Sequence, residues 1–207
     1  MEIFCTLGPK SLNKKFLSFA QRNKVTLVRL NLSHLNIKEL KKNILFIKKN
    51  SKLKICIDTE GAQIRTKLKS KSIEIKKNKK FYLSKEKGKF TLYPENVFDQ
   101  IKKGDILDIG FSNLKAKVFS KSGNNIVLKS LSSGLLENNK GVHITNRNIK
   151  IKFLTDKDLT SIKLSKKYKI RNFCLSFTNS VDDIRNFKKI VGNSRAIFKL
   201  ETKRAIK

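Results

Sequence analysis

The sequence predicts an α/β domain with a parallel sheet of five strands, interrupted by a small all-β domain. Apolar runs of strand length alternate with helical periodicity over the first 60 residues, and the same alternation returns after Gly141. Between these parts, short alternating runs are separated by glycines and show little helical periodicity. The predicted domains are therefore residues 1–66 and 141–207 for the α/β part and 67–140 for the insertion.

The first part of the α/β domain contains three predicted strands and two predicted helices. Apolar and β-branched residues place the strands at 2–7, 25–32 and 53–58. Ser11 can cap a helix over 12–23, and Asn36 can cap a second helix over 37–49. The order β-α-β-α-β implies parallel strands joined by right-handed crossovers.

The second part repeats this order after the insertion. Helices over 156–168 and 181–191 precede strands over 171–177 and 195–201. In such sheets the carboxyl ends of the strands gather at one edge, which is where the chemistry of α/β proteins is found. The polar residues that follow the predicted strands are therefore the first candidates for a site.

Composition limits the class of protein. Of the 207 residues 39% are hydrophobic and 14 are Phe, which is enough to bury a core. The chain begins without a basic segment followed by a long apolar one, so we expect a cytoplasmic protein with no membrane segment. The cysteines Cys5, Cys56 and Cys174 lie far apart in apolar runs, without the spacing of a metal site. They are expected to be buried free thiols.

The formal net charge of +32 is unusual and has two interpretations. A basic surface can bind nucleic acid, or it can be a solvated surface from a genome with biased codons. Of the 48 basic residues 40 are Lys and 8 are Arg, and the Lys are scattered through every segment, which favours the solvated surface. Non-specific binding to polyanions follows from this charge in either case.

Two groups of strand-end residues could bind ions. Asn31, Ser33, Asp58 and the carbonyl of Thr59 offer oxygen ligands and one negative charge, which suits a monovalent cation. A plain hydrogen-bonded network is the alternative, and spacing alone favours it. His34 is most simply a loop residue.

Charged residues near the strand ends form the second group. Arg29 and Arg65 could clamp phosphate oxygens, although a surface or salt-bridged arginine is the more common case. Lys199 and Glu201 are two residues apart and would share one side of a strand. This pair could place a divalent metal beside a charge-stabilising lysine, or it could be an ion pair without function.

Together these segments resemble the pyruvate kinase family. The strings Arg-x-Asn-x-Ser-His and Asp-Thr-x-Gly-x-x-Ile-Arg-Thr are specific, and all of the matching motifs occur in the family's order along essentially the whole chain. The motifs are TLGP at 6–9, VRLNLSH at 28–34, IDTEGAQIRT at 57–66, KGV at 140–142, FLTDKD at 153–158, LSF at 175–177 and IFKLE at 197–201. The resemblance implies a partial TIM barrel, with about five of eight strands, and an inserted small β-barrel lid domain.

The resemblance also implies an activity and a set of roles. The reaction is phosphoryl transfer between phosphoenolpyruvate and ADP, giving pyruvate and ATP in glycolysis, with Mg²⁺ and K⁺ as cofactors. Arg29 and Lys199 would bind substrate, and Lys199 would stabilise developing charge as the catalytic residue. The implied ligand sets are Asn31, Leu32, Ser33, His34, Arg65 and Lys140 for the nucleotide, Asn31, Ser33, Asp58 and Thr59 for K⁺, and Glu201 for Mg²⁺.

Some of the family's features are not found in these 207 residues. The second magnesium carboxylate belongs to a Gly-Asp-Leu-Gly motif that follows the fifth strand in the family, and Ile109 replaces an acidic residue that serves the nucleotide's metal. Five strands leave open edges, which favour association into a homo-oligomer. We therefore expect impaired catalysis. The alternative is a non-catalytic remnant of the fold that acts as a basic module for polyanions or nucleotides.

Overall fold

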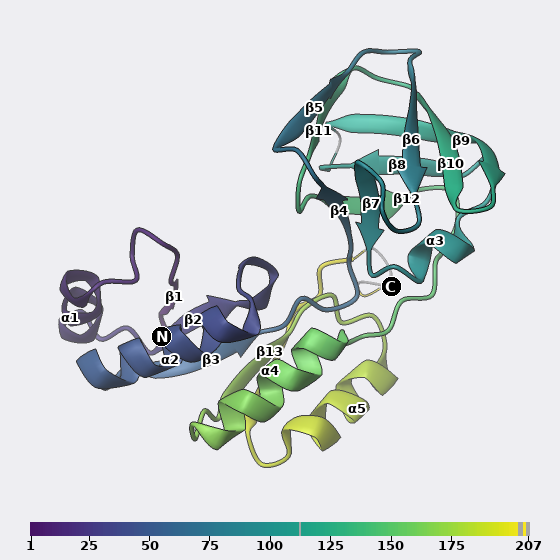
Figure 1. The fold of residues 1–207 in the computed structure, drawn as a ribbon. Helices are drawn as coiled ribbons and strands as arrows, with labels where there is room; N and C mark the ends of the chain where they lie inside the picture. The colour runs from purple at the N-terminus through teal and green to yellow at the C-terminus, as the bar shows by residue number, and fades with distance from the viewer. Residues whose placement is uncertain (112, 203–204, 206–207) are drawn as a thin grey trace. The chain divides into compact units, whose positions relative to one another are not determined.

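The computed structural model describes residues 1–111, 113–202 and 205, and the chain divides into two compact units. The first unit joins residues 1–62 to residues 152–207, and the second comprises residues 63–151 (Figure 1). The second unit is wider at both ends than the predicted insertion over 67–140. Its strand β4 (Ile64–Leu68) starts earlier, and Ile149 and Ile151 pack against its core.

The first unit is built on the predicted parallel sheet of five strands, in the order β1-β2-β3-β13-β14. The strands are β1 (Phe4–Thr6), β2 (Leu27–Asn31), β3 (Lys54–Asp58), β13 (Asn172–Leu175) and β14 (Arg195–Phe198). The helices are α1 (Lys14–Arg22), α2 (Ile37–Asn50), α4 (Asp156–Lys167) and α5 (Val181–Val191), with a short 3-10 turn, η1 (Leu32–His34), after β2. The α/β prediction is therefore confirmed.

The helices cover one face of this sheet, and α4 and α5 lie over β13 (Figure 1). Leu30, Ile57 and Phe173 point to this side and pack with Ile44 of α2 and Ile162 of α4. Alternate strand residues point to the opposite face, where a second, smaller apolar cluster contains Leu27, Cys56 and Cys174, with Ile197 packed against it.

The sheet of the first unit is strongly curved. Its edge strands are β1 and β14, and yet Arg195 of β14 forms a bidentate ion pair with Glu2, with Nη1–Oε1 and Nη2–Oε2 distances of 2.7 and 2.6 Å. The Arg195 guanidinium also lies 5.8 Å from the centre of the Phe4 ring. In a flat sheet these edges would be about 19 Å apart, at about 4.8 Å for each neighbouring pair. The curvature is that of part of a barrel.

Side-chain caps fix where the helices begin. Asn36 caps α2, which confirms the predicted cap, and it forms a reciprocal capping box with Glu39. The cap of α1 is Asn13, whose Oδ1 accepts a hydrogen bond from the N–H of Phe16, so the prediction of Ser11 was wrong. Ser11 instead accepts from the N–H of Gly8 and closes the turn after β1.

The second unit is an antiparallel, nearly closed β-barrel. Its main sheet has the order β6-β10-β9-β8-β12-β4-β7, and β5 pairs with β11 beside it. Phe81 and Phe90 stack across the two edge strands, with ring centres 6.3 Å apart. The remaining elements are β5 (Ser72–Ile75), β6 (Lys80–Ser84), β7 (Phe90–Tyr93), α3 (Val97–Gln100), β8 (Ile106–Ile109), β9 (Leu114–Ser122), β10 (Asn125–Ser130), β11 (Gly134–Glu137) and β12 (Gly141–Ile144). The short helix α3 was not predicted.

No helix in the described part of the chain combines the length and the apolar character needed to cross a membrane.

An ion pair with a buried carboxylate stabilises the second unit. The carboxylate of Asp105 is 3% exposed and accepts two hydrogen bonds from Arg147, at 2.7 Å from Nε and 2.6 Å from Nη2. Burial by itself raises the pKa of Asp105, but the hydrogen bonds from Arg147 and from the N–H of Lys102 outweigh it and hold the pKa below its usual value. The ionised pair therefore stabilises the folded unit at neutral pH.

We predict that Arg147→Ala lowers the free energy of unfolding of the second unit by about 3 kcal/mol, because it leaves a buried carboxylate unpaired. Because the folded pKa of Asp105 is depressed, this stabilisation is present above the unfolded pKa and is lost as the pH falls below about 4. Urea unfolding at pH 7 and pH 3 measures both effects. Lys85→Ala, which removes an exposed ion pair with Asp99, is the control and should leave the unfolding midpoint unchanged.

Candidate active site at the carboxyl ends of the parallel strands

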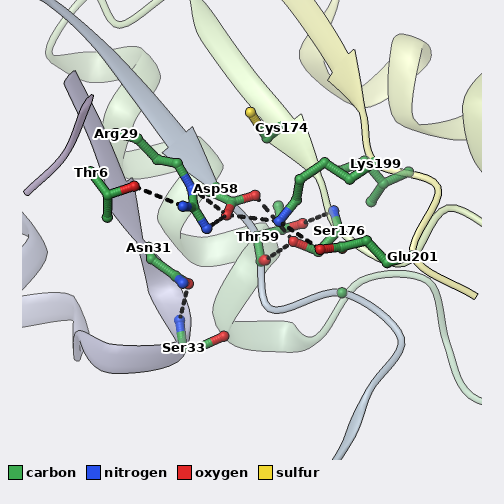
Figure 2. A network of polar contacts seen from close by, with 12 residues as sticks. Thr6, Arg29, Asn31, Ser33, Asp58, Thr59, Cys174, Ser176, Lys199 and Glu201 are labelled. Atoms are coloured by element: carbon green, nitrogen blue, oxygen red, sulfur yellow. Dashed lines mark hydrogen bonds and ion pairs between the residues drawn. The ribbon is translucent and has the colours of Figure 1, made fainter. Parts of the chain in front are cut away.

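The centre of the candidate site is the carboxylate of Asp58, at the last residue of β3. Its side chain is 1% exposed, and its Oδ2 accepts hydrogen bonds from Arg29 Nε at 2.7 Å and from Lys199 Nζ at 3.0 Å (Figure 2). A second contact comes from Arg29 Nη2. Its other oxygen, Oδ1, accepts from the hydroxyl of Ser176 at 3.1 Å. Both oxygens of the buried carboxylate are thus satisfied by protein groups.

Arg29 is held on two sides. It lies on β2 directly opposite Cys56 of β3, in a register that points its side chain toward Asp58. Its Nη1 donates to the hydroxyl of Thr6 at 2.8 Å, on the neighbouring strand β1. These contacts use three of the five N–H groups of the guanidinium, and its side chain is 27% exposed. The remaining donors suit an anionic ligand.

Lys199 and Glu201 follow β14, which ends at Phe198 and not at Glu201 as predicted. Their side chains nevertheless meet, with Lys199 Nζ 3.5 Å from Glu201 Oε1. The Lys199 side chain donates to Asp58, while Glu201 Oε2 accepts from the N–H of Phe177 at 3.1 Å. Two cations and two carboxylates therefore lie together with no net charge (Figure 2).

Ser176, the residue that follows β13, is not among the predicted site residues. Its hydroxyl lies 3.1 Å from Asp58 Oδ1 and 2.7 Å from the carbonyl oxygen of Thr59, and its N–H donates to the hydroxyl of Thr59 at 3.1 Å. Gly61 lets the loop after β3 approach this strand: its φ is +67°, and a Cβ there would come 2.3 Å from the carbonyl oxygen of Ser176. Only the position of Ser176 at a strand end could have indicated it.

The four predicted K⁺ ligands come from adjacent strand ends. Asn31 lies opposite Asp58 in the β2–β3 register, and its Oδ1 accepts from the N–H of Ser33 at 3.0 Å. The Thr59 side chain contacts Ser176. These groups present oxygen ligands and a single carboxylate, which is the chemistry that suits a monovalent cation, although Asp58 Oδ2 already accepts from Arg29 and Lys199. Asp58, Thr59 and Ser176 equally form a hydrogen-bonded network that needs no ion.

Glu201 is the single carboxylate predicted for Mg²⁺. Its side chain is 37% exposed, so one side of it remains available. In the described residues no three His, Cys, Asp or Glu side chains gather in a way that could hold a metal ion. Glu201 therefore fits Mg²⁺ only as one ligand of a shell completed by water and substrate oxygens, which is the usual coordination of this ion.

A second ionic cluster positions the η1 turn, and its residues were not predicted as part of the site. Lys157, in the first turn of α4, donates to the carbonyl oxygen of Leu32 at 2.6 Å and to Glu60 Oε1 at 2.8 Å. Asp158 accepts from the backbone N–H groups of Glu60 and Thr155, at 2.8 and 3.0 Å. Burial raises the pKa of Asp158 despite these donors. The start of α4 thus clamps both the β2 and the β3 loops.

The other predicted nucleotide residues have different surroundings. The side chain of Leu32 is fully buried in the core and its carbonyl oxygen accepts from Lys157, whereas His34 is exposed. Arg65 and Lys140 belong to the second unit. There Arg65 Nη1 donates to the carbonyl oxygen of Asn139 at 3.3 Å, and Lys140 Nζ lies 3.4 Å from Glu137.

All three cysteines are free thiols, and Cys56 and Cys174 are buried as predicted. Cys5 is only half-buried, because β1 is an edge strand. The sulfur atoms of Cys56 and Cys174 are 3.3 Å apart. This hydrogen bond is the main cause that raises the pKa of Cys56 and lowers the pKa of Cys174.

The fold is a partial α/β barrel with an inserted β-barrel and a cluster of charged residues at its strand ends. The family model described as the barrel domain of pyruvate kinase matches residues 1–207, and the chain belongs to the pyruvate kinase family. The sequence resemblance to this family is thereby confirmed.

Individual relatives show the extent of the match. The pyruvate kinase of Staphylococcus epidermidis is 28% identical over 208 aligned positions, which cover 94% of this chain and 36% of the relative. That of Staphylococcus saprophyticus is 29% identical and covers 92% of this chain and 35% of the relative. A crystal structure of Cryptosporidium parvum pyruvate kinase superposes with a TM-score of 0.88 at 22% identity, over 99% of this chain and 48% of that one. The chain thus spans about a third of the length of these curated relatives.

We predict that Asp58→Asn destabilises the first unit, because Arg29 and Lys199 would face each other without their shared anion. The expected loss in the free energy of unfolding is about 2 kcal/mol, less than for a fully buried pair because both cations are partly solvated. Urea unfolding followed by circular dichroism measures it. Asp182→Asn, in an exposed ion pair with Arg185, is the control. Equal midpoints for the two variants would contradict the central role of Asp58.

Proposed function

We propose that the strand-end site binds phosphoenolpyruvate and takes part in phosphoryl transfer between phosphoenolpyruvate and ADP, in the glycolysis of the cytoplasm. The observation that carries this proposal is the convergence of Arg29 and Lys199 on buried Asp58, next to Glu201. Phosphoryl transfer requires positioned cations more than covalent chemistry. A site of fixed cations beside one available carboxylate supplies them.

Each cation has a distinct part in this proposal. Arg29, fixed by Thr6 and Asp58, directs its remaining N–H groups toward the substrate phosphate. Lys199 lies between Asp58 and Glu201, at 3.0 and 3.5 Å, and is 26% exposed. From there its ammonium stabilises the negative charge that develops on the enolate oxygen as the phosphoryl group leaves.

The two cofactor ions have ligands in this arrangement. Asn31, Ser33, Asp58 and the carbonyl of Thr59 would hold K⁺, and Glu201 would hold Mg²⁺ together with substrate oxygens. The bound ions supply positive charge to the phosphate and carboxylate groups. For the nucleotide we retain the residues that the family resemblance implies, namely Asn31, the backbone of Leu32, Ser33, His34, Arg65 and Lys140.

We predict that Arg29→Met weakens the binding of phosphoenolpyruvate to the 207-residue chain by about 10–100-fold, as expected for the loss of a charged hydrogen-bonding group. Isothermal titration calorimetry with Mg²⁺ and K⁺ present measures the affinity. Lys163→Met, which changes an exposed charge on α4, is the control and should leave it unchanged. Equal affinities for the wild-type chain and Arg29→Met would contradict the assignment.

We also predict that these 207 residues, assayed alone, release pyruvate far more slowly than ordinary enzymes, which turn over at roughly 1–10³ per second. Glu201 is the single magnesium carboxylate matched to the family, and losing one oriented charge contact costs on the order of 10²–10³ in rate. A coupled pyruvate assay tests this, with Lys199→Met expected to abolish the residual rate. Turnover in the ordinary range that Lys199→Met abolishes would overturn the expected impairment while supporting the site.

The net charge of +32 favours one alternative, a non-catalytic basic module that binds polyanions. Binding of heparin that falls steeply with salt and is unchanged by Arg29→Met and Lys199→Met, with no measurable binding of phosphoenolpyruvate, would favour this module over the proposed transferase.

A further inference from the structure

We propose that Cys56 and Cys174 are a modification site for peroxide, at which the two thiols close to a reversible disulfide between β3 and β13. The pair has no part in the phosphoryl-transfer proposal. Cys56 and Cys174 lie on the neighbouring strands β3 and β13, each two residues before a residue of the strand-end site.

The first support is distance. The two sulfur atoms are 3.3 Å apart, although the residues are separated by 118 positions in the chain. A disulfide has a sulfur–sulfur bond of about 2.05 Å, so the sulfur atoms must approach by little more than 1 Å, and the two strands must shift enough to bring the diagonal Cα atoms within about 7 Å. The strand register explains the proximity: Cys174 lies opposite Asp58 in the parallel β3–β13 pair, which makes Cys56 its diagonal neighbour on the same face.

The second support is the environment of the pair. Cys56 and Cys174 lie on the face of the sheet opposite the helices, in the small cluster with Leu27 and Ile197. Cys56 is fully buried, whereas Cys174 keeps 4% of its surface exposed. Cys174 is therefore the thiol that a small oxidant reaches first, and Cys56 is the partner already in contact with it.

The chemistry needs a hydroperoxide as oxidant and balances in two steps. Cys174 Sγ attacks the peroxide: an S–O bond forms, the O–O bond breaks and, for hydrogen peroxide, water leaves, which gives the sulfenic acid. Cys56 Sγ then attacks Cys174 Sγ: the S–S bond forms, the S–O bond breaks, and a second water leaves. The two thiols lose two electrons and two protons to the peroxide, and a dithiol reductant reverses the reaction.

The location gives the modification a structural consequence. Cys56 lies two residues before Asp58, and Cys174 lies two residues before Ser176, whose hydroxyl meets that carboxylate. A disulfide therefore cross-links the two strands that present these groups. It also closes a long loop of the unfolded chain, so oxidation should raise the thermal midpoint of the first unit by on the order of 10 °C.

The test compares native and unfolded chain. The reduced 207-residue protein is treated with a small excess of hydrogen peroxide, and the products are mapped by proteolysis and mass spectrometry. In the native protein we expect the Cys56–Cys174 disulfide with Cys5 left free. In urea the Cys5–Cys56 disulfide should form more readily, because the chain between these residues is the shorter loop to close. A native protein that gives the urea pattern, or no intramolecular disulfide, would overturn the proposal.

Variants separate geometry from general reactivity. Cys5→Ser should form the disulfide at the wild-type rate and show the same rise in the thermal midpoint, reversed by dithiothreitol. Cys56→Ser should stop at the Cys174 sulfenic acid, which a dimedone reagent traps. If Cys56→Ser does not fold, the rate of disulfide formation in native Cys5→Ser against its rate in urea decides, because only the folded chain holds the two thiols in contact. Cys174→Ser keeps Cys56, and dimedone trapping at Cys56 in this variant as fast as at Cys174 in Cys56→Ser would contradict the order of the steps.

Discussion

The first unit depends on one constraint, the burial of the Asp58 carboxylate at the end of β3. A carboxylate that is 1% exposed must be paired, since an isolated buried charge is strongly unfavourable. The partners come from the ends of β2, β13 and β14, as Arg29, Ser176 and Lys199. Each of these strand ends is thereby fixed to the centre of the sheet. The same carboxylate that assembles the strand ends also aligns the cations of the proposed site.

Local patterns were sufficient to predict most of the elements. Helical periodicity and the Asn36 cap located α2 well, and alternation with strand-length apolar runs located the parallel sheet. The errors occur where tertiary contacts decide. The strand predicted over 195–201 ends at Phe198, although Lys199 still pairs through its backbone with Leu175 and Thr178 while its side chain reaches Asp58. The cap at Asn13 could not be told from one at Ser11, since both residue types are good caps.

The candidate site was predictable as a set of strand ends, but its connections were not. Ser176 and the pair of Glu60 with Lys157 join residues that are 97 to 118 positions apart, and no spacing rule relates such positions. The same limit applies to the sheet's curvature, which is indicated by the ion pair of Glu2 with Arg195. Sequence also left a cation site and a plain network as alternatives at Asp58. The geometry shows why these alternatives could not be separated. The oxygen atoms that accept hydrogen bonds around Asp58 are of the same kind as those that coordinate a cation.

The charge balance of the site connects its stability to the proposed chemistry. Arg29 and Lys199 offset Asp58 and Glu201, so the four side chains form a neutral cluster that is stable without a ligand. A phosphorylated enol acid brings several negative charges into this cluster, and the protein supplies no surplus positive charge among these four groups. Further cations must therefore enter with the substrate, and the oxygen ligands at Asp58 and Glu201 are where they can be held. In the proposed function, Mg²⁺ and K⁺ would supply the positive charge that this neutral cluster lacks.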